Sequence, residues 1–154
     1  MAHEGMTDSR VSMGAQDASE VAGGPGVPGG AGEARKWTLT VPAPCEYINL
    51  NSRMHWAQKA KLTKAWRLCT RLTATAEALP TNLERVHIVA HIIKPTNRQY
   101  DAHNLLPTLK AAIDGLVDHG LIPDDTNKHL IGPDLRQGGV GKPAIILTIT
   151  EESP

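Results

Sequence analysis

The chain has 154 residues, 40% of them hydrophobic, and its 16 basic and 16 acidic side chains give a formal net charge of zero. This length is typical of one domain with a tail. The sequence contains no apolar run of the roughly 18 residues that a membrane-spanning helix needs, and no secretory signal. We therefore exclude membrane and secreted classes and expect a cytoplasmic protein.

Residues 1–35 form a glycine-rich, acidic segment that differs from the rest of the chain. Residues 1–34 carry five acidic side chains and one basic one, whereas the remainder carries 11 acidic and 15 basic ones. Because this segment has few large apolar side chains, it cannot bury enough surface to offset the entropy of ordering. We expect a disordered tail over 1–35 and a mildly basic domain over 36–152, whose charge suits a polyanionic partner.

The first half of the domain predicts a strand and a long helix. Residues 36–42 are β-formers ended by a proline, and the loop APCEYINLNSR follows. Apolar residues at spacings of three and four predict a helix over 55–78. The predicted apolar stripe consists of Leu62, Ala65, Trp66, Cys69, Leu72 and Ala76.

Basic residues lie in that loop and on the opposite face of the predicted 55–78 helix. They are Arg53, Lys59, Lys64, Arg67 and Arg71. As phosphate contacts, such side chains would fix the position of a nucleic acid without reading its sequence. A solvated helix face has the same composition, so both interpretations stand at this point.

A second helix is predicted over 107–119, with Leu109, Ala112, Ile113, Leu116 and Val117 facing the core. Leu106 precedes a proline, which disfavours the α region, so we expect the helix to start at Pro107. Gly120 is the expected C-terminal stop.

Three further strands are predicted around this helix. Residues 84–93 carry apolar side chains on both faces, and shorter strands are expected over 127–132 and 144–150. The glycine-rich segment 136–142 is interpreted as a hairpin turn. The resulting order β-α-β-α-β-β predicts a small α+β domain, with a mixed sheet and two main helices on one of its faces.

Acidic residues flank the predicted 107–119 helix. Asp101 and His103 are separated by one residue, so in an extended chain they project to the same side. Past Gly120 the chain can turn back and bring Asp125 toward Asp101. Two or three clustered oxygen ligands suit a hard cation such as Mg²⁺, which activates water and neutralises a phosphodiester. Aspartates near helix ends also serve as caps and turn formers, which is the alternative interpretation.

The segment DAHNLLPTLKAAIDGLVDHGLIPDD (101–125) resembles the signature of the RusA family of Holliday-junction resolvases. Members carry a D-x-D-N-L opening, then K-A-x-x-D-A/G-L on a helix, then a glycine, an apolar pair and D-D. The likeness extends to the loop INLNSRMHW and the final strand ILTITEE, so it covers about 36–152. It implies a RusA-like fold and a Mg²⁺-dependent homodimer that nicks opposing strands of a four-way DNA junction. Such nucleases act in recombination and repair, and their genes are frequent in phages.

The resemblance also assigns roles to single residues. Asp101 matches the first catalytic aspartate and Asp125 the last, with Asp124 its less essential neighbour. Lys110 matches the motif lysine when LPT is treated as a three-residue insertion, and Asp114 then falls on the helix aspartate. The family pattern thus implies a catalytic set of Asp101, His103, Lys110 and Asp125, with Asp101, His103 and Asp125 as metal ligands.

The departure from the family pattern is His103, which replaces the second catalytic aspartate. Imidazole is a poor ligand for Mg²⁺ and a better one for Mn²⁺ or Zn²⁺. His103 could bind a softer metal, or Asp114 or Asp124 could replace the lost carboxylate. In the third case the protein binds junctions and cuts them poorly. The rival interpretation is a non-catalytic protein that binds branched DNA with a degenerate acidic site. A small-molecule phosphohydrolase, which uses similar acidic clusters, is a further class to test.

Overall fold

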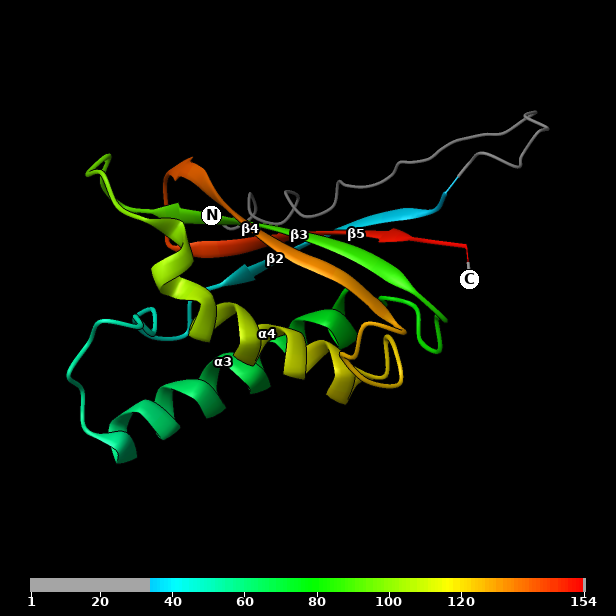
Figure 1. The fold of residues 1–154 in the computed structure, drawn as a ribbon, viewed down its shortest axis with the longest axis horizontal. Coiled ribbons are helices and arrows are strands. Elements are labelled where there is room, and N and C mark those ends of the chain that lie inside the picture. The colour runs from blue at the N-terminus through cyan, green and yellow to red at the C-terminus, as the bar shows by residue number, and fades with distance from the viewer. Residues whose placement is uncertain (1–33, 154) are drawn as a thin grey trace, which may run out of the picture.

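The computed structural model of the protein describes residues 34–153. Almost all of the tail expected over 1–35 therefore lies outside the described residues. The elements of the described part are shown in Figure 1. They are β2 (Lys36–Pro42), α3 (Trp56–Ala76), β3 (Val86–Lys94), a 3₁₀ helix η3 (Ala102–Leu105), α4 (Leu106–His119), β4 (Leu130–Val140) and β5 (Ala144–Glu151).

The strands form one four-stranded mixed sheet in the order β2-β5-β3-β4. β5 pairs antiparallel with both β2 and β3, whereas β3 and β4 are parallel. Parallel neighbours need a crossover connection, which α4 supplies between β3 and β4. The α+β class expected from the sequence is confirmed at this level, with two helices and a mixed sheet.

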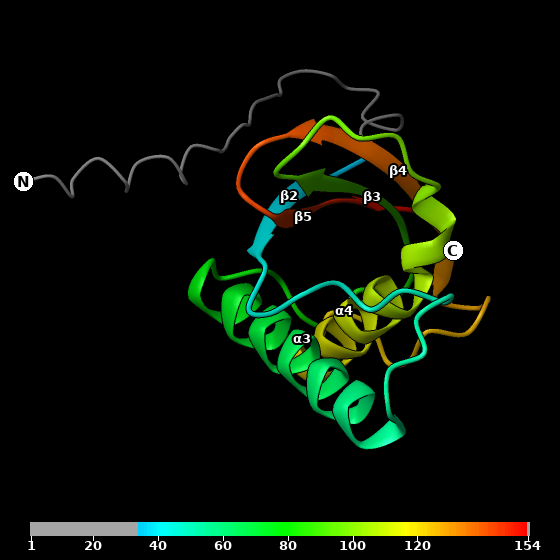
Figure 2. The same ribbon diagram turned by 90° about the vertical axis from the view of Figure 1, so that its left-hand side faces the viewer.

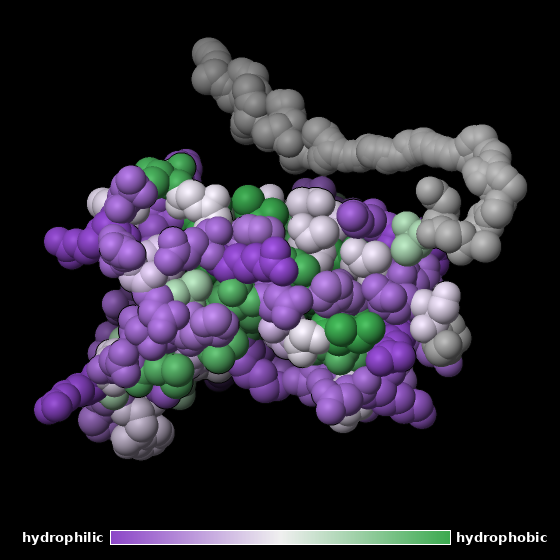
Figure 3. Space-filling model, turned by 45° about the horizontal axis from the view of Figure 1, so that its top comes forward, coloured by the Kyte–Doolittle hydropathy of each residue, from purple (hydrophilic) through white to green (hydrophobic). Residues whose placement is uncertain are grey.

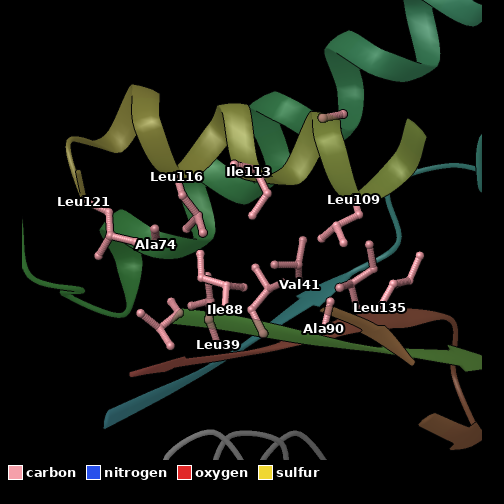
Figure 4. Close-up of a cluster of buried hydrophobic side chains, with 14 of the residues drawn as sticks. Leu39, Val41, Ala74, Ile88, Ala90, Leu109, Ile113, Leu116, Leu121 and Leu135 are labelled. Atoms are coloured by element: carbon pink, nitrogen blue, oxygen red, sulfur yellow. The ribbon is translucent and has the colours of Figure 1, made fainter. Parts of the chain in front are cut away.

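Both helices lie on one face of the sheet (Figure 2). The strand side chains that point to this face are fully buried, among them Leu39, Ile88 and Leu147. They meet α4 through Leu109, Ile113 and Leu116, as the close-up of the core shows (Figure 4). The core thus consists of aliphatic residues from alternate strand positions and from one stripe of α4. The expected core residues of this helix are buried, with Val117 partly exposed.

The long helix α3 turns a different stripe to the core from the one predicted. Its buried residues are Trp66, Thr70 and Ala74, spaced four apart. Leu72 is 52% exposed and Ala76 is also exposed, so the predicted stripe was wrong at these two positions. The reason is that Trp66, the buried one of the two tryptophans of the helix, fixes its rotation by filling the core and donating its indole N–H to the carbonyl of Glu46 at 3.0 Å.

α4 also begins differently from the prediction. Leu106 has φ −52° and ψ −38°, and the helix starts at this residue rather than at Pro107. η3 leads directly into α4, so the backbone is already helical before the proline. The missing N–H of Pro107 falls in the first turn, where it has no intrahelical acceptor in any case. Gly120 ends the helix with φ +100°, as the sequence predicted.

The largest difference from the prediction concerns β4. It spans Leu130–Val140 instead of 127–132, and the expected turn at 136–142 is mostly strand. Its pairing with β3 continues to the end, because Gly138 allows the two backbones to approach closely. A Cβ on Gly138 would lie 2.8 Å from the carbonyl oxygen of Ile92. Gly138, one of the glycines that suggested a hairpin, therefore serves a close strand contact.

Figure 3 shows a face of the molecule on which hydrophilic residues predominate and hydrophobic ones form separate patches. Consistent with this, no helix among residues 34–153 is long and apolar enough to cross a membrane.

The crossing of α3 and α4 depends on Gly115. A methyl group at this position would clash with the backbone carbonyl of Arg67 and lie 2.8 Å from Cβ of Thr70. We predict that Gly115→Ala lowers the free energy of unfolding by about 1–3 kcal/mol, because the helices must separate to admit it. Urea denaturation followed by circular dichroism measures the change, and an unchanged midpoint would contradict so close a crossing.

Candidate active site and basic groove

The loop between β2 and α3 is fastened to the start of α4. Thr108 is fully buried, and its hydroxyl accepts from the backbone N–H of Ile48 at 2.7 Å and donates to the carbonyl of Ile48 at 3.0 Å. The N–H of Leu50 donates to the carbonyl of Asn104 at 2.7 Å. The exposed Arg53, three residues after Leu50, is therefore on a loop that is tied to the segment following Asp101.

Asp101 and His103 lie next to each other at the entrance to α4. The carboxylate of Asp101 caps η3 by accepting the backbone N–H of His103 at 3.0 Å. Nδ1 of His103 is 3.5 Å from the same carboxylate oxygen. The side chains are 65% and 71% exposed, so they can reach a ligand from solvent. The expected proximity is present, but it comes from a helix cap rather than from an extended chain.

Asp125 returns to α4 and contacts Lys110. The ammonium group of Lys110 donates to Asp114 at 2.8 Å and to Asp125 at 2.5 Å. Asp114 is one helical turn away, whereas Asp125 is fifteen residues later in the chain. The hydrogen bonds from Asp114 and then Asp125 raise the pKa of Lys110. Lys110 is therefore a persistent cation at neutral pH and suits a negatively charged transition state better than proton abstraction.

The return of Asp125 depends on the turn after α4. Gly120 adopts a left-handed conformation, and Leu121 and Ile122 are then buried in the core. Asp124, two residues after Ile122, accepts hydrogen bonds from the hydroxyl of Thr126 at 2.6 Å and from its backbone N–H at 2.9 Å. These two bonds hold the pKa of Asp124 below its ordinary value. Asp124 thus has a turn-forming role, and the turn points Asp125 at α4.

The predicted metal ligands form two separate groups. Asp101 lies with His103 and Asp125 lies with Lys110, and no hydrogen bond or ion pair joins Asp101 to Asp125 within residues 34–153. In the same range, no three His, Cys, Asp or Glu side chains converge as a metal site. The pair of Asp101 and His103 nevertheless fits a divalent cation that takes its remaining ligands from water and phosphate.

A groove of about 820 Å³ runs along the exposed side of α3. Lys59, Lys64, Arg67 and Arg71 line it, which are four of the five predicted phosphate contacts, whereas Arg53 is not among the lining residues. Most of the surface that lines the groove is nevertheless apolar, and Trp56, Ala60 and Leu68 are among the lining residues. The structure therefore gathers these basic side chains around one concave surface.

One arginine of the groove is already paired. Arg67 donates to Asp118 of α4 through two nitrogen atoms, at 2.5 and 2.8 Å. This guanidinium lowers the pKa of Asp118, and the carboxylate in turn raises the pKa of Arg67. An incoming phosphate must displace Asp118 before it can accept hydrogen bonds from both Nε and Nη2 of Arg67.

The solvent-facing side of α3 carries more large apolar residues than the sequence predicted. Trp56 lines the groove and is 76% exposed, and Leu68 and Leu72 are 45% and 52% exposed. For Trp56 the sequence did give this signal, because a tryptophan at the start of a basic helix is a candidate for stacking on a base. The two leucines gave no separate signal because helical periodicity alone does not fix the rotation of a helix.

No known family model matches the chain, and no curated protein matches it significantly. The likeness to the RusA family therefore rests on the motif residues alone.

The groove yields a pair of opposite predictions for binding to a four-way DNA junction. Lys64→Gln removes a cation and should weaken binding and reduce the slope of log K against log salt by about one. Asp118→Asn frees Arg67 and should strengthen binding at low salt. Fluorescence anisotropy with a labelled junction measures both, and equal affinities for the two variants would count against the groove as a phosphate surface.

Proposed function

We propose that this protein is a RusA-like, metal-dependent endodeoxyribonuclease that resolves four-way DNA junctions by paired nicks in recombination and repair. The observation that carries the proposal is the contact of Lys110 with both Asp114 and Asp125. Three acidic or basic residues of the family-like motif, separated by up to fifteen positions, meet at one place on α4. A motif assembled by chance gives no reason for such convergence.

The proposed roles follow from the chemistry of the side chains. Asp101 and His103 are the candidate ligands of Mg²⁺ or Mn²⁺, which when bound would activate water and neutralise phosphate charge. Asp125, the third ligand that the motif implies, would have to leave Lys110 to join them. Lys110 stabilises the negative charge that develops on the phosphate oxygens. Asp114 keeps this ammonium group oriented on α4, which makes it a positioning residue.

A homodimer fits the proposed reaction. Two opposed strands of a junction must be cut, and a two-fold dimer presents two equivalent sites to them. The basic groove of each subunit would then contact the phosphates of the arms, with Arg53 on the loop beside the acidic pair. Such contacts select for shape rather than base sequence.

A second candidate is a non-catalytic protein that binds branched DNA. The separation of the acidic groups favours it, because Asp125 contacts Lys110 and the second motif aspartate is His103. Such a protein would bind DNA through the same groove as the proposed nuclease but would not cleave it.

Cleavage of a synthetic four-way junction tests the proposal. We expect the purified protein to make paired nicks in the junction and to leave a matched linear duplex intact, in Mg²⁺ or in Mn²⁺. Asp101→Asn should abolish the nicks while junction binding persists.

The metal dependence separates the remaining cases. Cleavage in Mn²⁺ alone would indicate His103 as a ligand. Tight binding without cleavage in either metal would identify the non-catalytic candidate. Turnover of nucleotides or phosphomonoesters, without junction cleavage, would instead indicate a small-molecule phosphohydrolase.

Lys110 gives a prediction about pH. Its pKa lies above the ordinary value of 10.5, so its ion pairs contribute below that pH and are lost as the pH rises through the folded-state value. The rate of cleavage between pH 7 and 9 should therefore show no titration of this lysine. Lys110→Met should lower the rate about 100-fold or more at every pH in this window. A variant whose rate recovers toward pH 9 would argue for a base at this position instead.

A further inference from the structure

A second, smaller hollow lies beside the entrance to the candidate site. Its volume is about 230 Å³, and it is enclosed by the loop 96–100 and the end of β4. These two segments lie side by side at one end of the molecule (Figures 1 and 2). The chain passes directly from Tyr100, which lines the hollow, to Asp101.

The lining of the hollow suits an anion. Asn97, Arg98, Gln99 and Gln137 contribute amide and guanidinium groups, and none of the lining residues is a carboxylate. A second cation is close, because Nζ of Lys94 lies 4.2 Å from the centre of the Tyr100 ring. Arginine and amide donors around a concave surface match the oxygen atoms of a phosphate group.

The hollow is held open by specific contacts. Gln137 donates its side-chain N–H to the carbonyl of Tyr100 at 2.6 Å, which fixes the end of the loop against β4. Gly139 has φ +125°, and apart from its chain neighbours no atom of residues 34–153 lies within 4 Å of where its Cβ would be, so the backbone of β4 lies open there. The hydroxyl of Tyr100 is shielded from solvent and has no hydrogen-bond partner within residues 34–153. The fixed loop and the open backbone at Gly139 leave the hollow accessible to a ligand.

We propose that this hollow binds a DNA phosphate next to the one that is cleaved beside Asp101 and His103, with Arg98 as its main contact. This inference rests on the proposed nuclease function and specifies how the strand is held. The strand continues from the acidic pair into the hollow, so that Arg98 is a specificity-determining residue for polynucleotides over free phosphate. Gln137 is a positioning residue, because it holds the loop that carries both Arg98 and Asp101.

Charge-matched variants of the full-length protein test the proposal. Arg98→Gln removes the arginine that lines the hollow. Arg136→Gln removes an exposed arginine of β4 that does not line it. Junction binding is measured by fluorescence anisotropy in EDTA over a range of salt concentrations. We expect about 5–10-fold weaker binding for Arg98→Gln, with the salt slope reduced by about one, and less than about 2-fold for Arg136→Gln. Equal losses for the two variants, or no loss for Arg98→Gln, would overturn the proposal.

Inorganic phosphate distinguishes the source of the anion. It is titrated into the wild-type protein and into Arg98→Gln, and amide chemical shifts of Gly138 and Gly139 are followed. Weak phosphate binding that needs Arg98, together with the loss of DNA binding, supports the polynucleotide site. Phosphate binding that needs Arg98 while DNA affinity is unchanged would overturn it in favour of a small-anion site.

The outcome is separable from that of the proposed function. If the protein binds the junction with an affinity that depends on Arg98 but never cuts it, the phosphate-site proposal is supported and the nuclease proposal fails. If the junction is cut and Arg98→Gln binds and cuts it normally, the nuclease stands and the hollow fails.

Discussion

The parallel pairing of β3 with β4 is the constraint on which the rest of this structure depends. Parallel neighbours cannot be joined by a tight turn, so the chain must cross over the sheet and come back. α4 makes this crossing, and its two connections leave the sheet at opposite ends. The acidic pair follows β3, and the turn with Asp124 and Asp125 precedes β4. The candidate site is therefore a consequence of one crossover connection.

The crossover also explains why one side of α4 is apolar and the other carries charged residues of the candidate site. One stripe of α4 is buried on the sheet, with Leu109, Ile113 and Leu116 fully enclosed. The opposite side of the same helix is left to Lys110 and Asp114. Because the buried stripe fixes the rotation of the helix, it also sets the direction of the charged side chains. Core packing and site geometry are thus determined together.

Features with a local cause could be predicted from the sequence, and those with a distant cause could not. The pairing of Lys110 with Asp114 follows from a spacing of four on a helix, and Gly120 follows from the rule for helix ends. The ion pair of Arg67 with Asp118 joins residues 51 positions apart on two helices, and no pattern within either helix contains it. The length of β4 was predicted wrongly for the same reason. The role of Gly138 is to let the backbones of β3 and β4 approach, and only the position of β3 shows this. The exposure of Leu72 depended on how Trp66 sets the rotation of α3.

The pair of Arg67 and Asp118 has a mechanical consequence as well as an electrostatic one. It bridges α3 and α4 at the level where Gly115 brings the two backbones together. Any polyanion that takes over this guanidinium removes a tie between the helices and leaves a carboxylate on α4 without its partner. The same helix carries Lys110, about one and a half turns of backbone from the crossing. The groove and the candidate site therefore depend on the same pair of packed helices, α3 and α4.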